Sequence, residues 1–270
     1  MTWVRFLTAI IIAPPVLVAV FMLAPKFFAL MVGAVILLGA WEWSRLAGID
    51  ARRYRSIFVG GVAMALWIVW LIPDSLKMAI LLLGVVWWGL ALGLVMGYPL
   101  SIENWRGPWR KLISGWLVLI PAWTGMVVLK THPDANWLLG LLLFLIWGTD
   151  VGAYFVGRKF GKTKLAPQVS PGKSWEGVWG GIGLGLLVTV VVGAWLGLSG
   201  SDAWIGLVVT CLVTMAASVL GDLYESVIKR QSGYKDSGNL LPGHGGIMDR
   251  IDSLTAAAPI FALCVMAGAF

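Results

Sequence analysis

Long apolar stretches separated by short polar segments run along the whole chain. A spanning helix needs about 20 mainly apolar residues, because the hydrocarbon core of a bilayer is about 30 Å thick. Stretches of this kind predict about nine transmembrane helices, at residues 4–23, 27–44, 57–73, 76–97, 112–129, 136–156, 177–198, 203–222 and 251–269. The pattern therefore predicts an all-α fold, a polytopic integral membrane helix bundle.

The positions of the basic residues support this number of spans. With nine spans and a cytoplasmic N-terminus, 17 of the 20 Lys and Arg residues fall in cytoplasmic segments, and only Lys26, Lys77 and Lys130 fall outside. Cytoplasmic segments of membrane proteins carry an excess of Lys and Arg. The net charge of +7 is thus mainly a sign of topology, and no nucleic-acid partner is expected because no binding motif accompanies it.

Composition agrees with a lipid environment. Hydrophobic residues make up 59% of the chain and charged residues 12%, whereas soluble domains are about 25% charged. We interpret residues 4–23 as a retained first span, because no clear cleavage site of a signal peptide follows them. Cys211 and Cys264 lie in apolar stretches without a Cys or His at ligand spacing, so neither a disulfide nor a thiolate metal site is expected.

We interpret the chain as one continuous membrane domain that has two parts. Residues 1–135 form N-terminal transmembrane helices, and residues 136–270 form a C-terminal region that carries the candidate chemistry. Within that region, the two longest polar stretches, 157–176 and 223–250, are expected to be cytoplasmic loops. Any catalysis should take place there or at the adjoining helix ends.

Asp150 is the first candidate site residue. It lies in the run Ile146-Trp-Gly-Thr-Asp-Val-Gly-Ala-Tyr154, close to a membrane helix. Ionisable residues in such positions are energetically unfavourable and mark functional sites by default. The alternative is a carboxylate that caps a helix or pairs with an Arg.

A basic, glycine-containing stretch follows Asp150. Its second half, residues 170–176, places Lys173 between Ser170 and Ser174. Backbone amides in such loops can surround phosphate groups, although the glycine spacing is not that of a P-loop. A basic loop attracted to anionic lipid headgroups is the alternative.

Residues 218–252 form the richest cluster. Asp222, Glu225 and Lys229 follow one another at helical spacing and share one face. Asp249 and Asp252, three residues apart, share a face where the last span begins. Carboxylates without Cys or His favour Mg²⁺ over Zn²⁺, and the interleaved cations indicate a metal–phosphate site. Solvated salt bridges are the alternative.

The basic groups of the last two clusters are candidates for phosphate contacts. Those expected to contact phosphate groups of substrates are Lys173, Lys229, Arg230, Lys235 and Arg250. Ser170 and Ser174 are expected to add hydroxyl or backbone contacts. His244 lies between Pro-Gly and Gly-Gly pairs, which favours a tight turn and a structural or substrate-contacting role over proton transfer.

The third cluster resembles the signature of the phosphatidate cytidylyltransferases, also called CDP-diacylglycerol synthases. It reads Ser226-x-x-Lys229-Arg230, four residues, then Lys235-Asp236-x-Gly238-x-x-Leu241-Pro242-x-His244-Gly245-Gly246-x-x-Asp249-Arg250-x-Asp252. The Ser-Pro-Gly-Lys-Ser-x-Glu segment at 170–176 and the segment Asp150-x-x-Ala-Tyr154-x-x-Gly157-Arg158 are also similar to that family. The resemblance covers residues 145–252 closely.

The resemblance implies a polytopic membrane enzyme that joins CTP to phosphatidate, a membrane lipid, giving CDP-diacylglycerol and pyrophosphate. The compact length and the absence of an organelle presequence lead us to expect a bacterial cytoplasmic (inner) membrane, with the active site facing the cytoplasm. The resemblance also implies Mg²⁺, a second cation such as K⁺, and a homodimer. The implied metal ligands are Asp222 and Asp249, with Asp150 and Asp252 close by. The catalytic set is Asp222, Asp249, Lys229, Arg230 and Asp252, and the substrate-binding set is Ser170, Lys173, Ser174, Lys235, His244 and Arg250.

Two other functions remain as alternatives. An enzyme that uses CDP-diacylglycerol as donor to an alcohol would carry Asp-Gly-x-x-Ala-Arg, and the chain has no such sequence. A cation-coupled transporter would place its acidic residues near the midplane of the membrane. Here they lie toward one side, which favours an enzyme.

Overall fold

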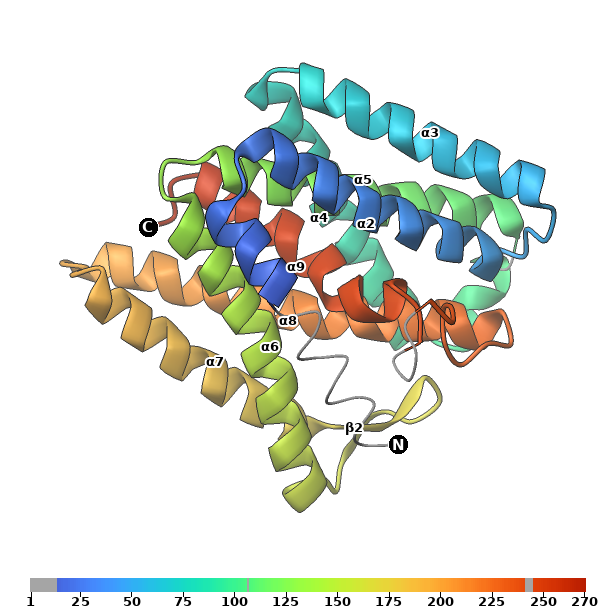
Figure 1. Ribbon diagram of the computed structural model, residues 1–270. Coiled ribbons are helices and arrows are strands. Elements are labelled where there is room, and N and C mark those ends of the chain that lie inside the picture. Colours follow the sequence, from blue (N-terminus) through green and yellow to red (C-terminus); the bar gives the residue numbers. More distant parts are fainter. Residues whose placement is uncertain (1–13, 106, 241–244) are drawn as a thin grey trace.

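The computed structural model describes residues 14–105, 107–240 and 245–270, which form a bundle of α-helices (Figure 1). A helical segment at residues 14–22 comes first. The elements after it are α2 (Pro25–Leu46), α3 (Arg52–Leu71), α4 (Asp74–Met96), η1 (Leu100–Trp105), α5 (Pro108–Thr131), α6 (Ala135–Phe160), β1 (Lys164–Ala166), β2 (Ser170–Ser174), α7 (Trp175–Trp195), α8 (Ser201–Gln231) and α9 (Met248–Met266).

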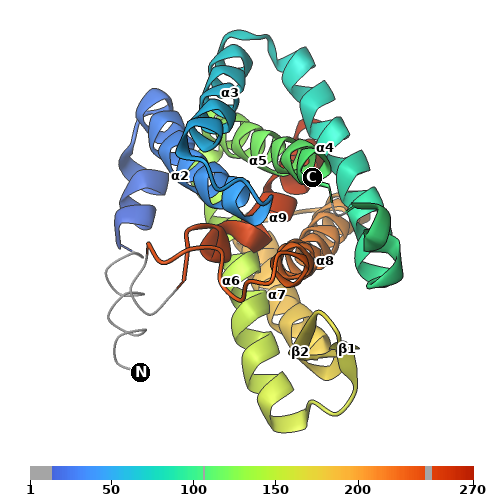
Figure 2. The ribbon, with the colours of Figure 1, turned by 90° about the vertical axis from the view of Figure 1, so that its right-hand side faces the viewer.

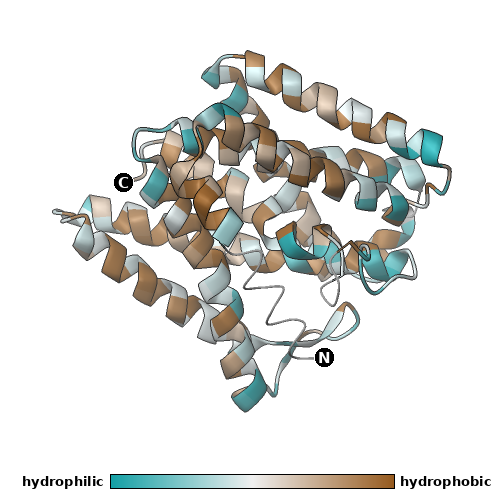
Figure 3. Cartoon of the chain, in the orientation of Figure 1, coloured by the Kyte–Doolittle hydropathy of each residue, from teal (hydrophilic) through white to brown (hydrophobic). Residues whose placement is uncertain are grey.

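Seven helices in the described residues, α2 to α8, are long and apolar enough to cross a membrane. Figure 3 shows hydrophobic residues along the helix bodies and hydrophilic residues gathered toward their ends. Half of the predicted span 4–23 lies outside the described residues, and the predicted span 251–269 corresponds to α9, which is not among those seven helices. The predicted fold class, an all-α polytopic membrane bundle, is confirmed.

Proline marks the start of several helices. Pro25 and Pro108 begin α2 and α5, and Pro73 directly precedes α4. Proline is favoured at the first helical position because its fixed φ suits the helix and its missing N–H has no partner there in any case. These helices therefore begin slightly before the apolar runs that predict them.

Helix α9 lies at the centre of the bundle, with α4, α5 and α8 packed around it (Figure 2). Its residues Ala256, Ala257, Ala258 and Phe261 are fully buried. A Cβ on Gly125 of α5 would lie 2.6 Å from the carbonyl oxygen of Ala258, so the two backbones approach as closely as glycine allows. This packing fixes the position of α9 and, with it, the polar residues at its N-terminus.

Helices α6 and α7 form an antiparallel pair that extends away from the other helices (Figures 1 and 2). Glycines allow the close contact between them. A Cβ on Gly152 would lie 2.6 Å from the carbonyl oxygen of Gly180, and a Cβ on Gly181 would lie 2.5 Å from that of Thr149. The pair carries the hairpin of β1 and β2 at its polar end.

The two predicted polar loops are shorter than the sequence indicates. Residues 223–231 continue α8, and residues 157–160 complete α6. Part of the first stretch also forms the antiparallel hairpin of β1 and β2, with Lys164 paired to Ser174. Hydropathy marks where the lipid-facing part of a helix ends, whereas the helix itself can continue into water, and this explains the difference.

Candidate active site

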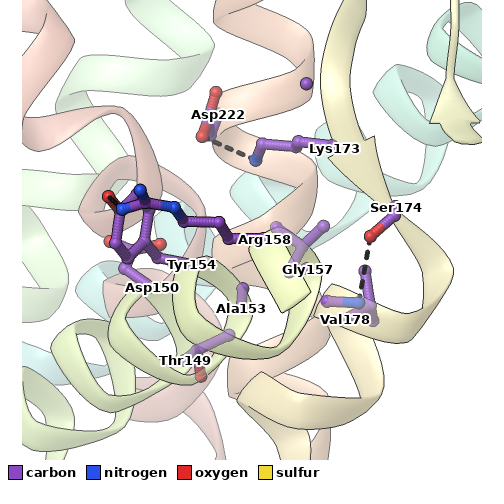
Figure 4. A pocket seen from close by; sticks show the side chains of 13 residues that line it. Thr149, Asp150, Ala153, Tyr154, Gly157, Arg158, Lys173, Ser174, Val178 and Asp222 are labelled. Atoms are coloured by element: carbon purple, nitrogen blue, oxygen red, sulfur yellow. Dashed lines mark hydrogen bonds and ion pairs between the residues drawn. The ribbon is translucent and has the colours of Figure 1, made fainter. Parts of the chain in front are cut away.

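A pocket of about 380 Å³ lies between α6, the hairpin, α7 and α8 (Figure 4). Its size is within the range of small-molecule sites. It is lined by Thr149, Asp150, Ala153, Tyr154, Gly157, Arg158, Gly172, Lys173, Ser174, Gly177, Val178, Val219 and Asp222. Charged groups and apolar side chains thus share one cavity, at the polar end of helices that can span a membrane.

An ion pair between Lys173 and Asp222 joins two of the clusters recognised in the sequence. Lys173 extends from β2 toward α8, and its Nζ lies 2.6 Å from Oδ2 of Asp222 (Figure 4). Both side chains keep more than a quarter of their surface accessible. A substrate phosphate and a cation could therefore both reach this pair.

Helix α6 contributes a polar face to the pocket. Asp150, Tyr154 and Arg158 follow at intervals of four residues, so they lie on one side of the helix. The guanidinium of Arg158 donates to the hydroxyl oxygen of Tyr154 at 3.0 Å. Asp150 lies within electrostatic range of Lys173 and Asp222, which places carboxylates of both α6 and α8 at the same cavity.

The turn before the hairpin uses its amides within the protein. The backbone N–H groups of Lys162 and Thr163 donate to the carboxylate of Glu176, at 3.2 and 3.1 Å. Ser174 caps the N-terminus of α7, where its Oγ accepts from the amide of Gly177 at 3.2 Å. Two amides of the loop predicted to surround phosphate groups therefore donate to Glu176 instead. Ser170 is the first residue of β2.

Lys229 bridges two carboxylates close to the end of α8. Its Nζ lies 2.7 Å from Oε2 of Glu225 and 2.6 Å from Oδ1 of Asp249. The other oxygen of Asp249, Oδ2, accepts from the amides of Ser237 at 2.9 Å and Gly246 at 2.7 Å. Asp249 is therefore held by protein donors on both oxygens, and its predicted role as a metal ligand stays a prediction.

Glu42 is a buried acidic residue that the sequence reading missed. It lies in α2, is 3% exposed, and accepts from the amides of Ile247 and Met248 and from the hydroxyl of Ser237. The signal that could have found it is a carboxylate inside an apolar stretch, the same reason that singled out Asp150.

The remaining predicted residues lie around these groups. Arg230 donates from Nε to the carbonyl oxygen of Val169 at 3.3 Å. Asp252 is the fifth residue of α9 and lies within electrostatic range of Asp222. Lys235 and Arg250 are exposed. His244 lies outside the described residues.

The carboxylates at the pocket suit Mg²⁺ without forming a closed cage. In the part of the chain that the structure describes, no group of three or more His, Cys, Asp or Glu side chains is arranged to hold a metal ion. Mg²⁺ is usually bound by one or two carboxylates together with substrate phosphates. Asp150 and Asp222, which line one cavity, fit that kind of binding.

Comparisons with known proteins show the family of the chain. A family profile described as the cytidylyltransferase family matches residues 3–267. A phosphatidate cytidylyltransferase of Pseudomonas aeruginosa is 50% identical over 97% of this chain and 96% of its own length. One of Haemophilus influenzae is 43% identical over 95% and 96%, and one of Brucella suis is 48% identical over 45% and 44%. These matches favour neither the transporter nor the CDP-diacylglycerol-dependent alternative. The chain belongs to the cytidylyltransferase family.

Proposed function

We propose that the protein is a phosphatidate cytidylyltransferase, which joins CTP to phosphatidate and releases pyrophosphate. Its relatives along the whole chain carry that name. The observation that carries the proposal is the pocket in which Lys173, Asp222 and Asp150 meet beside apolar residues. A nucleoside triphosphate needs the charged groups, and a lipid substrate needs the neighbouring apolar surface.

The reaction needs charge neutralisation more than it needs a base. A phosphate monoester has a second pKa near 6, so the lipid phosphate is largely a dianion at neutral pH. One of its oxygens forms a bond to the α-phosphorus of CTP. The bond from that phosphorus to the bridging oxygen of the β-phosphate breaks, and pyrophosphate leaves with the electron pair. The main obstacle is repulsion between a dianion and a polyanion.

The basic residues of the pocket can reduce this repulsion. Lys173 and Arg158 line the cavity and can contact phosphate oxygens of either substrate. Asp150 and Asp222 would hold Mg²⁺, with Asp249 and Asp252 as further predicted ligands. When bound, Mg²⁺ would neutralise triphosphate charge and fix the geometry of the phosphates. The second cation and the homodimer stay predictions.

The pocket is proposed to face the cytoplasm of a bacterial cell. It lies on the side of the helices where the predicted cytoplasmic segments gather, among them 157–176 and 223–250. CTP is available in the cytoplasm, and the headgroup of phosphatidate lies at the surface of the membrane. Helix ends on that side are positions that both substrates can reach.

Incubation of the purified full-length protein with radiolabelled CTP, phosphatidate and Mg²⁺ tests the proposal. We expect a lipid-soluble cytidine product that depends on phosphatidate and is abolished by excess EDTA. Asp222→Asn and Asp249→Asn should abolish the product while the protein still inserts into membranes. Asp202→Asn, the same change at the opposite end of α8, is the control and should leave activity intact. Undiminished turnover in EDTA would contradict the metal-dependent mechanism.

A further inference from the structure

Glu42 accepts hydrogen bonds from three donors that lie 195 to 206 residues away in the sequence. Its Oε1 accepts from the amide of Ile247 at 3.0 Å, and its Oε2 accepts from the amide of Met248 at 2.8 Å. The hydroxyl of Ser237 lies 2.9 Å from the same Oε2. Because Glu42 is 3% exposed, its carboxylate interacts with groups of the protein interior and not with solvent.

These contacts cap the N-terminus of α9 from another helix. Ile247 is the N-cap residue of α9, and its own side chain cannot cap the helix. The first N–H groups of a helix have no partner within it, and a negative charge is stabilising beside them. Glu42 supplies both the acceptors and the charge, so α2 fixes where α9 begins.

The same carboxylate explains two glycines of the 226–252 signature. A Cβ on Gly238 would overlap Oε1 of Glu42, and a Cβ on Gly246 would overlap Oε2. Any larger residue at either position would push the carboxylate away from Ser237 and from α9. The signature is therefore shaped by a residue that lies outside it, in the N-terminal half of the chain.

Ser237 connects Glu42 to the candidate active site. Its Oγ lies 2.9 Å from Oε2 of Glu42 and 2.9 Å from Oδ2 of Asp249, and its amide also donates to Asp249. A hydroxyl has a single proton, so Ser237 donates to one of these carboxylates at a time. The opposite oxygen of Asp249 faces Lys229 at 2.6 Å. The order of contacts is Glu42, Ser237, Asp249 and Lys229.

We propose that Glu42 is a positioning residue for cytidylyl transfer, acting through Ser237 and the start of α9 to set the orientation of Asp249. The inference rests on the proposed function, because it assigns Asp249 to the reaction. Displacement of a reacting group by about 1 Å can lower a rate by about 10²-fold. Loss of Glu42 should therefore lower turnover much more than it weakens CTP binding.

Steady-state kinetics of the full-length protein provide the first test. We expect Glu42→Gln to lower kcat by at least about tenfold while the KM for CTP changes by less than about threefold. Glu103→Gln is the matched control, because Glu103 is exposed in η1 and the chemical change is the same. An unchanged kcat in Glu42→Gln, or an equal loss in Glu103→Gln, would overturn the proposal.

A double-mutant cycle separates positioning from general destabilisation. If Glu42 acts through Ser237, the loss of kcat in Glu42→Gln/Ser237→Ala should be clearly smaller than the product of the two single losses. Losses that multiply would show independent roles and overturn the proposal. If Glu42→Gln does not accumulate in membranes, Ser237→Ala alone decides. It keeps the amide contacts of Glu42, and an unchanged kcat would count against the proposal.

Amide hydrogen exchange tests the geometry without relying on activity. In Glu42→Gln, the amides of Ile247 and Met248 should lose protection while those of α2 keep theirs. Unchanged exchange at both amides would overturn the inference, even if the protein proves to be a cytidylyltransferase. Conversely, lost protection in a protein without CTP-dependent activity would leave the positioning contact in place and remove the proposed function instead.

Discussion

Lys173 connects the hairpin to α8, as the contact between Arg230 and Val169 also does. Its ammonium group lies 2.6 Å from Asp222, and both residues line the pocket with Asp150. A carboxylate at this distance orients the ammonium. If Asp222 holds Mg²⁺ as proposed, the ammonium of Lys173 would be available to contact phosphate oxygens. Lys173 can thus pair with Asp222 in the absence of substrate and with phosphate oxygens in its presence.

Replacement of Lys173 by Met should lower kcat/KM for CTP by about 10²-fold, the usual effect of removing one donor that stabilises developing charge. Lys164→Met is the matched control, because Lys164 lies in β1 of the same hairpin, is exposed and does not line the pocket. Initial rates of cytidine transfer into the lipid phase measure both variants. Equal losses in the two variants would indicate an effect of hairpin charge in general.

At the scale of elements, two lysines counted as loop charges in the sequence are buried at helix ends. Lys111 of α5 donates to the carbonyl oxygen of Leu46, the last residue of α2, and to Ser232, the C-cap of α8. Lys130 donates to the carbonyl oxygen of Val20. Cations are stabilising beside helix C-termini, where carbonyl groups have no intrahelical partner. These lysines therefore connect neighbouring helices through hydrogen bonds.

Lys111→Met should lower the free energy of unfolding by about 1–3 kcal/mol, because it removes charge-assisted hydrogen bonds to buried acceptors. Thermal unfolding in detergent should show a reduced midpoint. Arg110→Met is the control, since Arg110 is the exposed neighbour of Lys111. If Lys111→Met unfolds at the temperature of the unaltered protein, the buried lysine does not join α2 to α8 in the way described.

The contact between α6 and α7 gives a second prediction at this scale. Gly181→Ala should lower the unfolding temperature, because its Cβ would lie 2.5 Å from the carbonyl oxygen of Thr149. Gly183→Ala, two residues further along the same helix, has open space around its Cβ and should be neutral or stabilising, since Ala is favoured over Gly by about 1 kcal/mol in helices. Similar midpoints for the two variants would contradict close α6–α7 packing.

At the scale of the whole molecule, the bundle places its candidate chemistry at one end. The pocket lies along the last turns of α6, beside Val219 and Asp222 of α8, where β2 leads into α7. Helix α9 begins nearby, and its N-terminus is held by Glu42 of α2. The C-terminal helices thus supply the pocket, and α2 of the N-terminal half holds the start of α9.

The proposed orientation can be tested with cysteine labelling in intact bacterial cells. In a background with Cys211 and Cys264 replaced by Ala, Asp202→Cys should react with a membrane-impermeant maleimide from outside. Lys235→Cys should react only after the cells are permeabilised. Both positions are exposed and lie at opposite ends of α8, so each serves as the control for the other. The reverse pattern would place the pocket outside the cytoplasm.

Much of the fold was predictable because a bilayer imposes a minimum apolar length on each span. Runs such as 76–97 and 112–129 therefore located α4 and α5 to within a few residues. The hairpin was missed, because hydropathy gives no signal for short polar strands. The spacing of Asp222, Glu225 and Lys229 indicated a helix, but hydropathy ended the span at 222 because it does not distinguish a helix in water from a loop. The candidate residues were recognised from charge and from family resemblance, whereas their partners were not.

The sequence by itself determined the class of the protein, most of its spans and the family it resembles. These properties depend on local composition and on residues close together in the chain. Only the tertiary structure decided that Lys173 meets Asp222 and that Glu42 holds Ser237, which is 195 residues away. Such contacts arise when distant helices pack around α9. A local pattern of polar and apolar residues does not specify which helices become neighbours.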